Sequence, residues 1–138
     1  MNSFKFDVAL TYASEQREYV GEVALILKRK GIKVFYDRFE EARLWGRDLV
    51  ERFQEVYYVE SRWCMMFISK DYVRKAWPSQ ERQFALDRQV REHGEYILPV
   101  RFNDTPVPGL STSIHFADGV KNTPTQLVEL FLQMSSLA

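Results

Sequence analysis

The segment RWCMMFIS (62–69) is the most constraining feature of this sequence, because it is apolar at nearly every position. A strand with one face in water alternates apolar and polar residues, whereas a strand covered on both faces is apolar throughout. The segments FKFDVALTY (4–12) and EYILPVRF (95–102) are also β-rich and largely apolar. These three segments therefore indicate central strands of a parallel sheet with helices on both faces.

Segments with helical spacing separate these strands. In residues 15–31 the apolar side chains recur at helical spacing, and Gly31 supplies a stop signal. The other segments interpreted as helices are 47–60, a run from near Pro78 to Gly94, and 123–134 with Thr123 as its N-cap. Short strands are expected at 32–36 and 113–117, and loops at 37–46 and 70–77.

The alternation of strands and helices predicts one domain over residues 1–138 with an α/β, flavodoxin-like architecture. That architecture is a three-layer sandwich whose five-stranded parallel sheet has the order 2-1-3-4-5. Ligands of such sheets bind beyond the carboxyl ends of the strands, where the strand order reverses. The loops at that edge are 12–15, 37–47 and 69–81, so we expect the functional residues there.

The charge balance and the small number of potential metal ligands exclude several classes of function. The 19 basic and 19 acidic residues give no net charge, which argues against broad nucleic-acid or anionic-membrane binding. Cys64 is the only cysteine, so no disulfide within the chain is expected, and its apolar segment predicts a core position. His93 and His115 are far apart in sequence, so no metal site is expected. With no secretory signal pattern and no long apolar run, a cytoplasmic protein without a membrane span is expected.

The stretch Trp77-Pro-Ser-Gln-Glu81 lies at the predicted binding edge, where the helix after 62–69 begins. Position alone allows structural interpretations, with Glu81 as a first-turn acid that interacts with the helix dipole and Trp77 as a core anchor. Ser14 is equally well explained as an N-cap, and Asp37 as ordinary turn chemistry. The 14% aromatic content would nevertheless suit a pocket that stacks a flat ring.

Three stretches carry a resemblance to a known family. They are FDVALTYASEQ near the start, VFYDRFEEARLWGRDL after the second strand and FISKDYVRKAWPSQERQFAL after the third. In this order and at these places they resemble the three successive boxes of a TIR (Toll/interleukin-1 receptor) domain, most closely those of the bacterial branch. The resemblance extends from about Phe4 to Leu132 and implies the same five-stranded parallel fold.

The resemblance also implies an enzymatic activity. Many bacterial, plant and some animal TIR domains cleave NAD+ at the nicotinamide–ribose bond and leave ADP-ribose or a cyclic ADP-ribose isomer. In those enzymes the essential glutamate belongs to a Trp-x-x-x-Glu pattern, which Trp77 and Glu81 match here. The resemblance therefore implies that Glu81 is catalytic and that Trp77 forms a wall of the substrate pocket. NAD+ is then the substrate, and no cofactor is expected.

A single carboxylate suits this reaction. Nicotinamide departs as a neutral molecule and needs no general acid, while positive charge develops on the ribose as in glycoside hydrolysis. A carboxylate beneath the sugar can stabilise that charge, hold ribose hydroxyls or trap the sugar covalently. The sequence leaves open whether the product is linear or cyclic.

Further substrate-binding candidates lie at the same edge and follow from the same resemblance. Tyr12, Ala13 and Ser14 end the first strand, where the family's loop contacts the nucleotide. Asp37 can orient its loop or a ribose hydroxyl. The remaining candidates are the cations near the expected diphosphate, Arg38, Arg43 and Arg47, and the loop that covers the pocket or docks on a neighbour, Trp45 and Gly46.

Two interpretations of the chain differ in the purpose of TIR–TIR assembly, which either activates an enzyme or recruits other TIR domains. As an NAD+-cleaving effector, the chain would act in a homo-oligomer or filament of TIR domains and respond to a fused or separate sensor, as in bacterial antiphage immunity. It would then be the N-terminal part of a longer protein or the effector of a multi-protein system. The alternative is a non-catalytic scaffold for TIR–TIR interaction, which would have no reason to keep Trp-x-x-x-Glu. A related nucleoside-processing hydrolase is a third interpretation.

Overall fold

The computed structural model describes residues 4–136, and at residues 76–78 it describes the backbone alone. The strands in this part of the chain form one sheet in which all neighbours are parallel. They are β1 (Phe6–Thr11), β2 (Val34–Phe35), β3 (Ser61–Ile68), β4 (Ile97–Arg101) and β5 (Ala117–Asp118), in the order β2-β1-β3-β4-β5. The predicted α/β, flavodoxin-like architecture with the order 2-1-3-4-5 is therefore confirmed.

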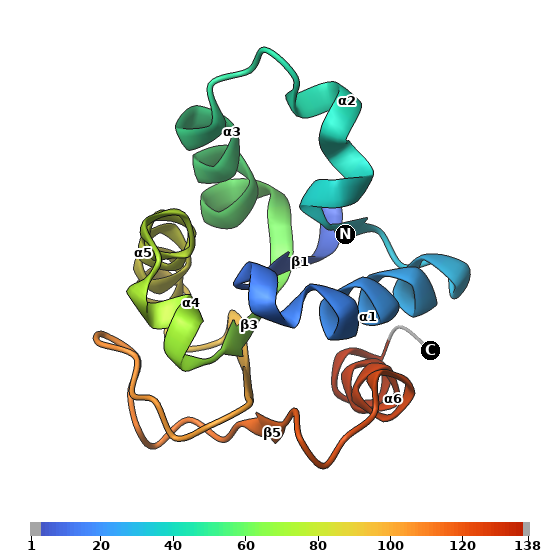
Figure 1. The fold of residues 1–138 in the computed structure, drawn as a ribbon, viewed down its shortest axis with the longest axis vertical. Coiled ribbons are helices and arrows are strands. Elements are labelled where there is room, and N and C mark those ends of the chain that lie inside the picture. The colour runs from blue at the N-terminus through green and yellow to red at the C-terminus, as the bar shows by residue number, and fades with distance from the viewer. Residues whose placement is uncertain (1–3, 137–138) are drawn as a thin grey trace.

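Helices cover both faces of this sheet. The α-helices are α1 (Arg17–Arg29), α2 (Glu41–Leu44), α3 (Leu49–Glu55), α4 (Lys70–Arg74), α5 (Ala76–Arg91) and α6 (Pro124–Ser135). Short 3-10 turns, η1 (Ser14–Gln16) and η2 (Asp37–Glu40), follow β1 and β2, and a π-helical turn, η3 (Val56–Glu60), follows α3. In Figure 1, α1 and α6 lie on one side of the sheet, and α3, α4 and α5 lie on the other. Among the described residues, no helix is both long and apolar enough to cross a membrane.

Each face of the sheet has its own apolar core, as a central strand that is apolar throughout requires. Phe67 of β3 packs with α1 and α6 side chains such as Phe131. Its neighbours Cys64 and Met66 point to the opposite face and pack with side chains that include Tyr72 of α4. Cys64 is 0% exposed, so the predicted core position of this cysteine is confirmed.

Two segments that the sequence predicts as loops are largely helical. Residues 37–46 contain η2 and α2, and residues 70–77 contain α4 and the beginning of α5. These helices are short and mostly polar, so no apolar repeat marks them in the sequence. Ser69 does supply a local signal for α4, because its Oγ accepts a hydrogen bond from the Tyr72 N–H at 3.1 Å.

Other helix and strand ends also depart from the prediction. Ser14 forms no side-chain cap, because η1 precedes α1 and Gln16 takes the N-cap position. The strand expected at 113–117 is reduced to Ala117–Asp118, and the residues just before it form turns and irregular structure. Thr123 is confirmed as the N-cap of α6, where it forms a reciprocal capping box with Gln126.

The π-helical turn η3 fixes the junction between α3 and β3. The backbone N–H of Ser61 donates to the Val56 carbonyl five residues earlier, and the Ser61 hydroxyl donates to the same oxygen at 2.7 Å. Within this turn, Tyr57 is buried and its hydroxyl donates to the Leu10 carbonyl of β1 at 2.9 Å. The turn therefore ties the end of α3 to the strand that ends beside the site.

Candidate active site

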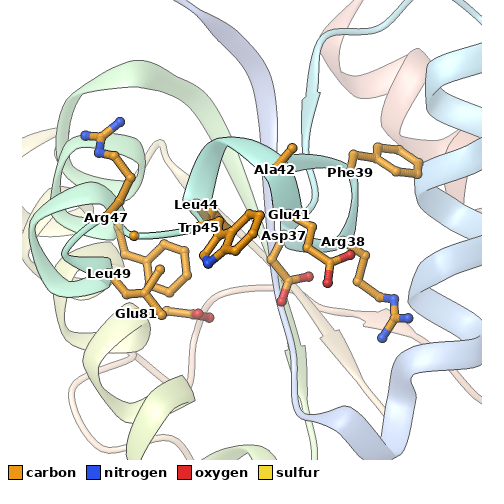
Figure 2. A pocket seen from close by; sticks show the side chains of 12 residues that line it. Asp37, Arg38, Phe39, Glu41, Ala42, Leu44, Trp45, Arg47, Leu49 and Glu81 are labelled. Atoms are coloured by element: carbon orange, nitrogen blue, oxygen red, sulfur yellow. The ribbon is translucent and has the colours of Figure 1, made fainter.

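A cleft of about 990 Å³ opens at the edge of the sheet where the strand order reverses. This is the place at which the architecture predicts a ligand. Figure 2 shows the carboxyl groups of Asp37 and Glu81 turned into the same open space. The residues that line the cleft are Asp37, Arg38, Phe39, Glu41, Ala42, Leu44, Trp45, Gly46, Arg47, Leu49, Phe53 and Glu81.

A smaller pocket of about 230 Å³ adjoins the cleft and shares Asp37, Arg38 and Glu81 with it. Its other lining residues are Tyr12, Ser14, Arg17 and Lys75. The loops expected at this edge, 12–15, 37–47 and 69–81, therefore each contribute residues to the two hollows that meet at Glu81.

Glu81 lies in the second turn of α5, because that helix begins at Ala76 after Lys75 as its N-cap. The sequence prediction starts the helix near Pro78, so the interpretation of Glu81 as a first-turn acid is wrong; the dipole effect is confined to the first turn. Trp77 belongs to the same helix four residues earlier, so the two positions share a helix face. The side chain of Trp77 lies outside the described residues, and its role as a pocket wall stays a prediction.

The Glu81 carboxyl group is held by a residue at the end of the first strand. Its Oε1 accepts a hydrogen bond from Thr11 Oγ1 at 2.8 Å, across 70 positions of sequence. The Tyr72 hydroxyl of α4 lies 3.0 Å from the same Thr11 oxygen. Thr11 and Tyr72 are both 0% exposed. Side chains from β1, α4 and α5 therefore meet in a buried hydrogen-bond chain that ends at Glu81.

The environment of Glu81 favours its protonated form. Burial raises the pKa of Glu81 to about 8, and the negative charge of Asp37 acts in the same direction. The hydroxyl groups of Thr11 and Tyr57 favour the carboxylate and lower the pKa, but burial outweighs them. A carboxyl group that exchanges its proton near neutral pH inside a cleft is typical of catalytic sites.

Asp37 follows β2 and is oriented by Tyr12. The Tyr12 hydroxyl donates to Asp37 Oδ1 at 2.7 Å, and the Tyr12 ring packs on Tyr36 with ring centroids 5.7 Å apart. Burial and the Asp37 carboxylate raise the pKa of Tyr12 well above its usual value. Tyr12 and Asp37, both predicted site residues, thus form one unit beside Glu81.

The three predicted arginines occupy different places. Arg38 lines both the cleft and the smaller pocket. Arg47 lines the cleft but extends away from Glu81 in Figure 2, and its guanidinium lies 3.4 Å from Glu55. Arg43 pairs with the buried Glu40 at 3.2 Å and lines a separate hollow beside β2. The structure therefore does not bring Arg43 to the cleft, because Glu40 holds its guanidinium elsewhere.

Trp45 and Gly46 form an exposed part of the cleft rim. The Trp45 side chain is 89% exposed and projects over the open space in Figure 2. Gly46 has φ of +80°, a left-handed conformation that favours glycine. An indole this exposed does not plug its own loop, so the structure agrees with the docking interpretation of this residue rather than with the plug.

The end of β1 shows which of its predicted residues reach the site. Ala13 is 1% exposed and belongs to the apolar core, so its side chain does not line the pocket. Ser14 lines the smaller pocket, and its Oγ accepts a hydrogen bond from Lys75 Nζ at 3.0 Å. Lys75 also forms an ion pair with Glu15 at 2.7 Å, which connects η1 to the start of α5.

Several lining residues were not among the predicted ones. Arg17 and Lys75 bring cations to the smaller pocket, and Leu44, Leu49 and Phe53 give the cleft an apolar wall. The position of Lys75, two residues before Trp77 at the predicted edge, could have identified it as a lining residue. The lining residues of α3 could not be identified from the sequence, because their contribution depends on how that helix packs. Among residues 4–136, no three His, Cys, Asp or Glu side chains are grouped so that they could hold a metal ion.

Sequence comparisons found a matching family model and several similar proteins. A family model described as a TIR domain matches residues 8–131. The 3' cyclic ADP-D-ribose synthase AaTIR of Aquimarina amphilecti is 45% identical over 128 residues, which cover 93% of this chain and 39% of that protein. The NAD(+) hydrolase TcpA of Theionarchaea archaeon (strain DG-70-1) is 35% identical over 99 residues, 71% of this chain and 29% of that protein. The chain thus spans less than half of the length of these relatives.

Solved structures share the fold. The TIR domain of the Toll-related receptor TRR-2 from Hydra magnipapillata has a TM-score of 0.72 at 21% identity and covers 94% of this chain and 98% of that one. The TIR domains in the structure of the activated Roq1 resistosome, which recognises the pathogen effector XopQ, have a TM-score of 0.62 at 26% identity. That similarity covers 73% of this chain and 60% of the Roq1 chain.

Proposed function

The chain belongs to the TIR domain family, and on that premise we propose that its cleft cleaves the nicotinamide–ribose bond of NAD+. The observation that carries the proposal is Glu81, which lines the cleft, is held there by Thr11 and has a pKa of about 8. The names of the two relatives described above, a cyclic ADP-ribose synthase and an NAD+ hydrolase, support the same substrate. The proposal makes the chain an NAD+ nucleosidase that uses NAD+ as a substrate and needs no cofactor.

The reaction needs one well-placed negative charge. The bond between ribose C1' and the nicotinamide nitrogen breaks, its electron pair leaves with nicotinamide, and positive charge develops on the ribose. In its ionised form the Glu81 carboxylate stabilises that charge in surroundings that exclude much of the water. Attack of water at C1' gives ADP-ribose, whereas attack by a nucleophile of the same substrate molecule gives a cyclic isomer. Both routes release nicotinamide and one proton, which the attacking group loses.

The other lining residues are assigned to the rest of the substrate. We assign Asp37, which Tyr12 holds, to accept a hydrogen bond from a ribose hydroxyl. We assign Arg38 and Arg47 to the diphosphate; Arg38 lines both hollows and Arg47 lines the cleft, which supports this assignment. Ser14 lines the smaller pocket with Arg38. Trp77 is assigned to the pocket wall on the nicotinamide or ribose side, from the position of its backbone in α5 alone.

We further propose that the enzyme is active as an assembly. The exposed Trp45 on a loop at the cleft rim supports contact with a second TIR domain, and the activated resistosome among the similar structures contains assembled TIR domains. In this proposal the chain is the TIR part of a cytoplasmic antiphage system, with a sensor fused to it or on a separate polypeptide. Binding to nucleic acid or membrane is not part of the proposal, because the chain has no net charge.

The test is to measure nicotinamide release from NAD+ by the purified chain, both dilute and clustered on a surface, by chromatography. We expect release under clustering, at a rate per molecule that rises with protein density. The same chromatogram identifies the other product as linear or cyclic. Absence of nicotinamide under all clustering conditions would favour the scaffold, the interpretation that the exposed Trp45 supports equally well.

Replacing Trp45 with Ala separates assembly from folding. Because the side chain is 89% exposed, we expect the free energy of unfolding to change by less than about 0.5 kcal/mol. Loss of the docking contact should lower the activity of clustered protein about tenfold, since contact residues of this kind contribute more than about 1 kcal/mol to association. Urea denaturation and the nicotinamide assay measure the two effects.

Val120→Ala is the matched control, because Val120 is an apolar side chain that is 73% exposed and lies outside the cleft. It should leave both stability and clustered activity unchanged. If Trp45→Ala lowers activity by the same factor in dilute and clustered protein, Trp45 contacts substrate rather than a neighbouring domain.

A further inference from the structure

We propose that Thr11 is a positioning residue of this site, whose hydroxyl is oriented by Tyr72 and in turn holds the Glu81 carboxylate at the end of β1. The inference rests on the proposed function only for the catalytic role of Glu81, because the contacts of Thr11 with Glu81 and Tyr72 do not depend on the reaction. Thr11 Oγ1 lies 2.8 Å from Glu81 Oε1 and 3.0 Å from the Tyr72 hydroxyl. Thr11 and Tyr72 are fully buried, so they act on the reaction through Glu81 and not on the substrate.

The direction of the hydrogen bonds follows from the number of protons. An ionised carboxylate only accepts hydrogen bonds, so the Thr11 hydroxyl donates its one proton to Glu81. The Tyr72 hydroxyl must then be the donor to Thr11 Oγ1. The chain therefore runs from Tyr72 through Thr11 to Glu81, and each bond polarises the next.

Both hydroxyl groups are carried by rigid elements. Thr11 pairs with Met66 in the register between β1 and β3, so its backbone is fixed by the centre of the sheet. Tyr72 lies in α4, whose first turn is capped by Ser69. A side chain held by such a frame keeps the carboxylate within the narrow range of orientations that catalysis requires.

Thr11 is the strongest of the described influences that favour ionised Glu81. Burial and Asp37 favour the protonated form, whereas Thr11 and, to a smaller extent, Tyr57 favour the carboxylate. The other titratable or charged groups around the carboxyl come from several elements: Cys64 of β3, Tyr72 of α4, Glu41 and Arg47 of the cleft, and Tyr12, Arg17, Arg38 and Lys75 of the smaller pocket. The Thr11 hydroxyl therefore both orients Glu81 and keeps part of it ionised near neutral pH.

The experiment replaces Thr11 with Val, which keeps the shape of the side chain and removes the hydroxyl. A charge-assisted hydrogen bond of this kind is expected to hold the pKa of Glu81 about one unit lower than it would otherwise be. Thr11→Val should therefore move the midpoint of Glu81 up by about one pH unit. The midpoint is read from the carboxyl carbon in ¹³C NMR without NAD+, with the signal assigned by its absence in Glu81→Gln. With NAD+, kcat at about pH 7 should fall about tenfold while KM changes little.

Three further variants separate positioning from stability. Thr11→Ser keeps the donor and should restore the wild-type midpoint. Tyr72→Phe removes the first donor of the chain, should shift the midpoint in the same direction by less, and serves as the test if Thr11→Val does not fold. Ser61→Ala removes a different buried strand hydroxyl, which lies 2.8 Å from the Tyr96 hydroxyl, and should lower stability without moving the midpoint.

The two proposals fail in different ways. If the wild type cleaves NAD+ but Thr11→Val or Tyr72→Phe leaves the Glu81 midpoint and the pH profile unchanged, the positioning role is wrong. If the wild type releases no nicotinamide but the NMR midpoint shifts as expected, Thr11 positions Glu81 and the proposed function is wrong.

Discussion

Replacing Glu81 with Gln is expected to lower the rate of NAD+ cleavage at least about a thousandfold, because the amide cannot carry the charge that opposes the developing charge on the ribose. Loss of one preorganised electrostatic contact at a reacting centre typically costs about a hundredfold to a thousandfold in kcat. Glu81 is the carboxylate that the proposed function assigns to the reacting carbon of the ribose, which places the expected loss at the upper end. The measurement is nicotinamide release by clustered protein, wild type against variant.

Gln is chosen because it can keep the hydrogen bonds that connect Tyr72, Thr11 and residue 81. The amide oxygen of Gln can accept the hydrogen bond that Thr11 donates to Glu81 Oε1. The variant should therefore fold, and NAD+ binding measured by calorimetry should persist. The matched control is Asp87→Asn, an exposed carboxylate on the same helix that contacts Gln83 and lies outside the cleft. Turnover by Glu81→Gln comparable to that of Asp87→Asn would remove Glu81 from the reaction.

The second large effect concerns the free energy of unfolding as a function of pH. The pKa of Glu81 is raised to about 8 in the folded state from 4.5 in the unfolded state. Between these two values the folded protein keeps a proton that the unfolded chain has released, so stability falls as pH rises through this window. Replacing Glu81 with Gln removes this contribution, because the amide does not titrate.

We therefore expect Glu81→Gln to unfold like the wild type at about pH 4, below the window, and to be more stable than the wild type at about pH 8. The difference at the higher pH should be about 3 kcal/mol, which is less than the full shift would give because the carboxyl borders an open cleft. Urea denaturation of both proteins at several pH values measures it. Parallel pH curves for wild type and variant would mean that Glu81 is ionised in the folded state throughout this range.

These two expectations are linked by a stability–activity trade-off. A carboxyl group that must be ionised to act, yet is half-buried, destabilises the fold at the pH where it acts. A gain in stability together with a loss of activity in one variant is characteristic of a side chain retained for chemistry rather than for packing.

The parts of the fold that sequence predicts are those with a strong local pattern. The apolar character of β3 predicted a sheet covered on both faces, and Thr123 with Pro124 predicted the start of α6. Helix α2, with four residues, is too short to show a helical repeat, so the sequence predicted a loop there. Strand β5 was predicted at 113–117 but consists of Ala117 and Asp118. Two residues are too few to show the alternation of apolar and polar side chains that marks a strand.

The site was predictable as a place but not as a set of contacts. The sheet order predicted the edge, and the resemblance to TIR domains pointed to Glu81 as the carboxylate at that edge. The contact between Thr11 and Glu81 joins residues 70 positions apart, and no local pattern encodes it. Arg43 and Arg38 look alike in the sequence, yet only Arg38 reaches the cleft, because the choice of Glu40 as a partner depends on packing.

The π-helical turn η3 has a consequence for how the length of the chain is fixed. Its wide turn accommodates one more residue than an α-helix would between Val56 and Ser61. Deleting one residue here should convert the wide turn into an ordinary α-helical turn and leave α3 in phase with β3, so the buried Phe53 keeps its place. Deleting a second residue would rotate α3 by about 100° relative to β3. The mostly exposed loop between β4 and β5 has no helical phase to preserve. Homologous chains should therefore differ freely in length in that loop, and by one residue at most between α3 and β3.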